Sequence, residues 1–142
     1  MIRGLARCLA ALAVLGLAGC SLWGTEGGPG GAGGAAPTVT DSVALAVAGS
    51  DGVQRIEVTM GDDLRFTPTV VRAHPGIVEF TFRNVGGTPH DVQFAEPLQT
   101  STGNLNGGDV RTVRVTVDRA GTYPYPCAYH VSSGMQGTLE IQ

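Results

Sequence analysis

Tyr123-Pro-Tyr125-Pro-Cys127-Ala-Tyr-His130-Val-Ser-Ser-Gly-Met135, close to the C-terminus, is the stretch that decides the fold. Tyr123, Tyr125 and Cys127 alternate with two prolines, so their side chains share one face of an extended segment. In a β-sheet protein that face must point inward, which directs the Cys127 sulfur towards the interior. A short loop then carries His130 and Met135, giving the spacing Cys-x2-His-x4-Met.

These side chains offer a thiolate, an imidazole and a thioether, one donor short of a four-coordinate metal site. His90 is the upstream candidate for the fourth position. Two His and one Cys with a weak axial Met are the ligands of a blue-copper electron-transfer centre. The set suits both oxidation states, because Cu(I) favours soft sulfur and Cu(II) favours imidazole. Structural zinc is the main alternative metal, but it prefers four Cys or His donors and rarely uses Met.

The composition predicts one all-β domain. The chain has 142 residues, of which 22 are Gly and 8 are Pro, and both residue types are poor in helix interiors. The formal net charge is -3. Without Arg3 and Arg7, seven of the nine basic residues stand against twelve acidic ones, so the chain after residue 19 carries about -5. This balance excludes the basic surface of a nucleic-acid-binding protein.

Alternating apolar and polar residues predict the strands. The expected strands cover residues 53–60, 69–73, 77–83, 90–94, 110–117 and 137–142, and residues 38–52 could add one more. Turn residues separate them, including His74-Pro75-Gly76, where His74 is interpreted as an ordinary turn residue. Ala95–Asp109 lacks periodicity and is expected to be a long loop. Strands at this spacing, without a helical period, indicate a β-sandwich.

The segment Asp118–Tyr123 resembles a tyrosine corner. In that motif a Tyr hydroxyl bonds back to the backbone where a Greek-key connection enters its next strand. The sequence therefore predicts a Greek-key β-sandwich.

The N-terminus resembles the signal peptide of a bacterial lipoprotein. Residues 1–19 begin with Arg3 and Arg7 and continue as an apolar run too short to span a bilayer. Leu17-Ala18-Gly19-Cys20 resembles a lipobox, which implies that Cys20 is acylated and becomes the first mature residue. An ordinary signal peptide with a chance cysteine is the alternative. Acyl chains on Cys20 would hold the protein at the membrane surface.

Residues 20–37 are expected to be a flexible tether. The segment 24–36 contains seven Gly and no large apolar side chain, so it cannot bury enough surface to offset the entropy of ordering. Residues 38–142 would form the folded domain. A Cys20–Cys127 disulfide is the alternative use of these cysteines, but it would tie the tether to a loop whose other residues suit a metal.

Residues 53–142 resemble the cupredoxin family, the plastocyanin-like small blue-copper proteins. The resemblance rests on Asn-x-Gly-x-x-Pro-His ending at His90, on Asp-x-Ala-Gly-x-Tyr-x-Tyr-x-Cys ending at Cys127, and on Cys-x2-His-x3-Gly-Met ending at Met135. It implies one copper ion cycling between Cu(I) and Cu(II). His90, Cys127 and His130 would be its equatorial ligands, and Met135 its long axial ligand.

Some residues depart from the family pattern. Pro124 and Pro126 remove two backbone donors from a strand that should pair, so their positions are expected at the ladder's end or facing away from it. Asp91 follows His90 where many cupredoxins have Asn. Asp91 is either a solvated carboxylate or an acceptor that tunes the metal from outside its ligand shell. Tyr129 is expected at the rim of the site, where it could contact a partner.

The leading hypothesis is a membrane-tethered blue-copper carrier, monomeric, that passes single electrons between a redox donor and an acceptor protein. It would be exported and lipid-anchored at the outer face of the cytoplasmic membrane. It would not be an enzyme, because Met135 closes the axial position and no general acid or base is indicated. The alternatives are a copper chaperone or copper-resistance lipoprotein and, with less support from the ligand set, a copper-free binding domain.

Overall fold

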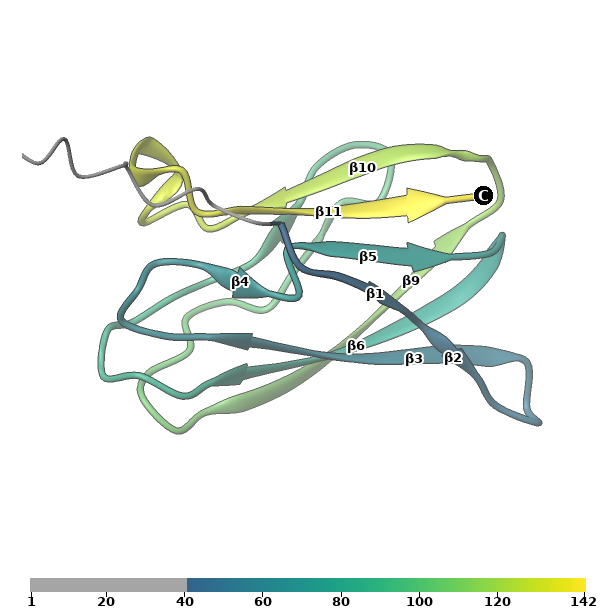
Figure 1. Cartoon of the computed structure of the whole chain (residues 1–142). Helices are drawn as coiled ribbons and strands as arrows, with labels where there is room; N and C mark the ends of the chain where they lie inside the picture. Colours follow the sequence, from purple (N-terminus) through teal and green to yellow (C-terminus); the bar gives the residue numbers. More distant parts are fainter. Residues whose placement is uncertain (1–40) are drawn as a thin grey trace, which may run out of the picture. The chain divides into compact units, whose positions relative to one another are not determined.

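The computed structural model describes residues 41–142, which form a β-sandwich (Figure 1). The predicted signal peptide, Cys20 and the whole predicted tether lie outside the described residues. The strands are β1 (Val43–Leu45), β2 (Val47–Ala48), β3 (Val53–Met60), β4 (Phe66–Thr67), β5 (Val70–Ala73), β6 (Gly76–Asn84), β7 (Gln93–Phe94), β8 (Thr100–Ser101), β9 (Val110–Val117), β10 (Gly121–Pro126) and β11 (Gln136–Ile141). A turn of 3-10 helix, η1 (Val131–Ser133), precedes β11, and residues 41–142 contain no α-helix. Within these residues no helix is long and apolar enough to cross a membrane.

Two main sheets make up the sandwich. The first has the strand order β1-β5-β11-β10, and the second has the order β2-β3-β6-β9 with β4 paired to β3. β1 and β2 follow each other in sequence but belong to different sheets, so the N-terminal segment passes from one sheet to the other. The chain also crosses between β4 and β5, between β5 and β6, and between β9 and β10, after which β10 and β11 pair antiparallel. The prediction of an all-β Greek-key sandwich is confirmed.

The alternation in the sequence builds the core. Val78, Phe80 and Phe82 of β6 are fully buried, whereas the residues between them are more exposed. On the neighbouring strand β9, Val113 and Val115 are buried in the same way, as the pattern predicts. Burying these side chains removes apolar surface from water, which is the dominant favourable contribution to folding.

Tyr125 lies at the centre of an aromatic cluster between the sheets. Its ring centroid is 5.1–6.0 Å from those of four phenylalanines. They are Phe66, Phe80, Phe82 and Phe94. Its hydroxyl is buried without a hydrogen-bond partner among the described residues, and burial raises the pKa of Tyr125 well above its usual value. The packing of Tyr125 thus fixes β10 against the core two residues before Cys127.

The region after His90 differs from the prediction. Only Gln93–Phe94 of the expected strand 90–94 is regular, whereas His90 forms a single bridge with Leu105. Their backbone N–O distances are 3.0 and 2.7 Å. The expected loop 95–109 contains β8 and buries Leu105 completely. These isolated contacts leave no period-two pattern in the sequence, so alternation alone could not reveal them.

The two prolines of β10 lie on an edge strand. Cys127 N donates to Met135 O over 3.1 Å, which places Tyr125 and Tyr123 in the hydrogen-bonded positions of the ladder with β11. Pro124 and Pro126 alternate with them, so the positions without N–H face away from β11. The expectation that these positions face away from the ladder is therefore correct, and the missing donors also protect the edge from pairing with another chain.

The predicted tyrosine corner is present. The Tyr123 hydroxyl donates to the Arg119 carbonyl over 2.8 Å, at the point where the chain enters β10. This bond fixes the start of the strand that ends at Cys127.

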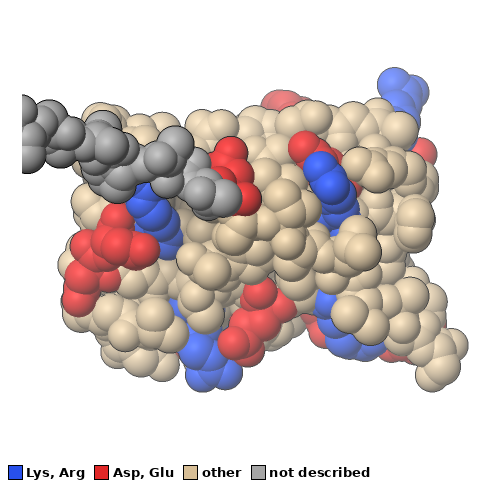
Figure 2. Space-filling model, in the orientation of Figure 1, with Lys and Arg blue, Asp and Glu red and all other residues tan. Residues whose placement is uncertain are grey.

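Charged side chains on the outer face of the second sheet are paired. Arg55 contacts both Asp51 and Glu79, and Glu79 also contacts Arg114. On the face in view, Figure 2 shows acidic and basic side chains interspersed rather than collected by sign. Because these pairs are partly exposed, each contributes little to stability.

Candidate metal site

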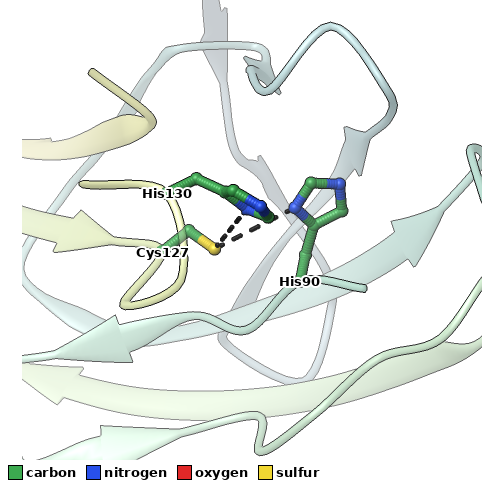
Figure 3. A group of neighbouring side chains, drawn as sticks. All are labelled: His90, Cys127 and His130. Atoms are coloured by element: carbon green, nitrogen blue, oxygen red, sulfur yellow. Dashed lines mark hydrogen bonds between the residues drawn. The ribbon is translucent and has the colours of Figure 1, made fainter. Parts of the chain in front are cut away.

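Three potential ligands converge at one end of the sandwich (Figure 3). The donor atoms of His90, Cys127 and His130 all lie within 4.8 Å of one another. His90 Nδ1 is 3.9 Å from Cys127 Sγ, and His130 Nδ1 is 3.5 Å from the same sulfur. His90 and Cys127 are fully buried, whereas His130 is half-buried.

The hairpin between β10 and β11 carries the downstream ligands on a compact loop. His130 N donates to Cys127 O, and Met135 N donates to His130 O, so the loop folds back on itself. Gly134 follows η1 with φ of 83°, a left-handed conformation that favours glycine. Met135 is fully buried, and its carbonyl accepts from Cys127 N. The loop therefore returns Met135 to the position beside Cys127.

His90 is held by its main chain and by its ring. The backbone is fixed by the bridge to Leu105, and ring atom Nε2 lies 3.0 Å from Gly61 O. A carbonyl only accepts hydrogen bonds, so Nε2 carries the proton and Nδ1 presents its lone pair towards Cys127. Burial lowers the pKa of His90, which favours the neutral ring that a metal requires.

Burial raises the pKa of the Cys127 thiol. Main-chain hydrogen bonds from Asp91, Tyr129 and His130 act in the opposite direction and favour the thiolate. A bound cation would replace the thiol proton and supply the charge compensation that burial denies.

Asp91 is buried beside the ligands, with only 5% of its surface exposed, so it is not a solvated surface carboxylate. Oδ1 accepts from Ala128 N over 2.6 Å, and Oδ2 accepts from Gln93 Nε2 over 2.7 Å. Ala128 directly follows Cys127, so this carboxylate links the segment carrying His90 to the ligand loop.

Two other residues singled out from the sequence are not part of the described site. His74 is in an exposed turn, where Nδ1 contacts Gln142 O at 3.1 Å, away from the other histidines. Cys20 lies outside the described residues. Among the residues that the structure describes, Cys127 forms no disulfide.

Sequence reasoning missed the residues that support His90. Gly61 contributes only its carbonyl, which no side-chain pattern can indicate. Asn84 is buried, and its amide donates to Thr88 O and Leu105 O over 2.8 and 3.0 Å. Asn84 is the first residue of the Asn-x-Gly-x-x-Pro-His motif, and its place in that motif is the sequence signal for this role.

Residues 36–141 match the family model described as Cupredoxin-like domain. The chain belongs to the cupredoxin-like family. Its domain is 33% identical over 99 residues to plastocyanin B'/B'' of Nicotiana tabacum, covering 61% of this chain and 99% of the relative. It is also 32% identical over 111 residues to the copper-containing nitrite reductase of Alcaligenes xylosoxydans xylosoxydans, covering 67% of this chain but 32% of the reductase.

Among solved structures, auracyanin A of Chloroflexus aurantiacus, described as a "blue" copper protein, has the same fold. The TM-score is 0.56 at 22% identity, covering 64% of this chain and 100% of auracyanin A. At this identity the likeness establishes the fold of the cupredoxin-like domain, and its chemistry depends on its own side chains.

The donor set of this cupredoxin-like domain fits a copper ion. Two imidazoles and one thiolate converge, and a buried thioether follows on the same loop. Soft sulfur and imidazole together are acceptable to both common oxidation states of copper. Three of the four ligands predicted from sequence thus converge, and the fourth, Met135, is buried on the loop that carries two of them.

Proposed function

We propose that this cupredoxin-like domain is a type 1 copper electron-transfer protein. The observation that carries the proposal is the convergence of His90, Cys127 and His130 within 4.8 Å, from two separate parts of the sandwich. A bound copper ion would supply one-electron redox chemistry. The plastocyanin relative and the auracyanin neighbour support this assignment.

The chain's own contribution is to hold the donors still. Hydrogen bonds to Gly61 and Leu105 fix His90, and the backbone hydrogen bond from Cys127 to Met135 closes the ligand loop. Because packed elements fix both sides of the site, the ligands need to move little when the metal changes its charge. A small rearrangement is the property that fast electron transfer requires.

His130 is proposed as the electron port. It is half-buried while the other two converging ligands are fully buried, so its ring offers the shortest route from the site to solvent. Exposed apolar side chains occur at this end of the domain: Val85 is 63% exposed, Tyr129 54% and Val131 49%. Tyr129 meets the His130 ring edge-on, with centroids 6.3 Å apart. Apolar side chains around an exposed ligand suit brief docking of a redox partner.

A copper chaperone is the second candidate from the ligand set. Transfer of Cu(I) to an acceptor commonly relies on accessible Met and His side chains. In the described part of the chain both methionines, Met60 and Met135, are buried, which favours a carrier that retains its metal. We also propose that the domain is not an enzyme. The reductase relative does not carry its activity to this chain, which spans 32% of it.

The location is proposed from the sequence. Acylation of Cys20 would anchor the domain at the outer face of the cytoplasmic membrane, where monomeric carriers could reach donor and acceptor proteins. Replacing Cys20 with Ala is expected to move the protein from the membrane fraction to the soluble exported fraction. Continued membrane association of Cys20→Ala would exclude the lipid anchor.

Retention of copper during redox cycling tests the carrier assignment. Protein loaded with one equivalent of Cu(II) should be reduced and reoxidised repeatedly without losing metal to an excess of an apo Cu(I) acceptor. Transfer of most of the copper to the acceptor within one cycle would support the chaperone instead.

Asp91 is proposed to tune the site. Both of its oxygens accept hydrogen bonds, as expected for a carboxylate anion, and it lies beside the residue that follows Cys127. A negative charge there favours the more positive oxidation state of the metal, and so lowers the reduction potential.

A further inference from the structure

Asp62 lies outside the ligand set, yet its carboxylate joins the two segments that position His90. It directly follows Gly61, whose carbonyl accepts from the His90 ring. Its Oδ1 accepts from Gly87 N over 2.9 Å and from Thr88 N over 2.8 Å. These two amides belong to the turn that leads into His90. One carboxylate therefore connects the ring acceptor of His90 to the backbone that delivers His90.

The contact between these segments is close. A Cβ atom added at Gly86 would stand 2.7 Å from both the backbone nitrogen and Oδ1 of Asp62, which is too near for any side chain. Val85 N also donates to Met60 O over 2.8 Å on the same boundary. The turn 85–88 is thus seated directly against the turn that begins at Gly61.

Hydrogen bonds are the main cause of the shifted pKa of Asp62. Those from Thr88, followed by the one from Gly87, hold the pKa of that carboxyl below its usual value. The neighbouring Asp63 is also exposed, and the structure gives its side chain no hydrogen bond. The two adjacent carboxylates thus carry the same charge at the same end of the domain, but only Asp62 is bonded to the turn before His90.

We infer that Asp62 is a positioning residue, which holds the Gly61 carbonyl in register with Nε2 of the His90 ring and thereby keeps the metal-facing Nδ1 of His90 directed towards Cys127. The inference rests on the proposed function only in naming the metal as the object that Nδ1 faces. The positioning of the His90 ring by Asp62 and Gly61 is expected in the metal-free protein as well.

Three substitutions separate geometry from charge. Asp62→Ala removes both the acceptor and the charge. Asp62→Asn removes the charge but keeps an oxygen that can accept from Gly87 N and Thr88 N. Asp63→Asn removes an equal charge from the adjacent residue without touching these bonds, and serves as the matched control. A fourth, Gly86→Ala, disturbs the same contact from the opposite side while changing no charge.

The first readout is nitrogen NMR of the His90 ring in the metal-free protein. We expect Asp62→Ala to accelerate solvent exchange of the His90 Nε2 proton about tenfold, the change expected when a hydrogen bond is weakened by loss of its support. The ring should also populate the other tautomer. Asp62→Asn and Asp63→Asn should match the wild-type protein, and Gly86→Ala should resemble Asp62→Ala.

The second readout is the Cu(II) EPR spectrum of the loaded proteins, where Asp62→Ala should alter the hyperfine coupling and Asp63→Asn should not. Unchanged His90 exchange and tautomer in Asp62→Ala would overturn the inference, as would equal effects of Asp62→Asn and Asp62→Ala, since these would point to charge. If neither the wild type nor the variants bind copper, the proposed function fails, while the NMR result still decides the role of Asp62.

Discussion

Asp91→Asn provides the sharpest test of how the protein sets the properties of its site. The substitution keeps the shape of the side chain and an oxygen for Ala128 N, but removes one buried negative charge. The new Asn side chain can donate its NH2 group to Gln93, because the Gln93 amide can turn to present its oxygen. The change is therefore mainly electrostatic.

The magnitude follows from Coulomb's law. Asp91 is one hydrogen bond from the residue after Cys127. Two unit charges about 4 Å apart interact by about 1 kcal/mol in water and about 4 kcal/mol at an effective dielectric constant of about 20, and these values set the upper limit for a carboxylate in this position. For a one-electron couple about 59 mV corresponds to a tenfold change in equilibrium constant, so the reduction potential should rise by up to about 40–170 mV. The sign is positive because removing the anion destabilises the oxidised metal more than the reduced metal.

Spectroelectrochemical titration of copper-loaded wild type and Asp91→Asn measures this shift. Asp63→Asn is the control, since Asp63 is exposed to water and its removal should change the potential far less. An unchanged or lower potential in Asp91→Asn, with the visible spectrum intact, would refute the proposed role of Asp91.

Three further substitutions test the packing around the ligand loop. Tyr125→Phe should raise the free energy of unfolding by about 1 kcal/mol in urea denaturation, because it removes a buried hydroxyl that has no partner among the described residues; destabilisation would mean that the hydroxyl is bonded in solution. Tyr123→Phe should have the opposite sign, a loss of about 1 kcal/mol, because the bond to Arg119 O disappears; equal stability of wild type and variant would count against the tyrosine corner. Gly137→Ala should destabilise by about 1–3 kcal/mol in the same assay, since the new Cβ would overlap the Tyr125 ring, and a neutral result would contradict the packing described for β10 and β11.

The sequence is informative wherever side chains carry a pattern. Alternation locates the long strands β3, β6 and β9, and the spacing from Cys127 to Met135 identifies the ligand loop. The period of two also predicts that Tyr125 and Cys127 face inward, and both are fully buried. Each of these features is local, so a short window of residues contains the whole signal.

The remainder depends on contacts between distant backbone atoms. The acceptor for the His90 ring is the carbonyl of Gly61, and the bridge partner of His90 is Leu105. Neither residue type marks such a role. The environment of Asp91 is equally undetermined by the sequence, because its hydrogen-bond partner Ala128 lies 37 positions away. Such contacts arise only when the sheets pack.

The proposed function depends above all on copper binding by the Cys127 sulfur, within a site that includes His90 and His130. The decisive measurement is the visible absorption spectrum of the Cu(II)-loaded domain, compared with that of Cys127→Ser. We expect intense thiolate-to-copper charge-transfer absorption at one copper per chain, abolished in Cys127→Ser. A colourless Cu(II) complex of the wild-type domain, or a colour that survives in Cys127→Ser, would contradict copper binding through this sulfur.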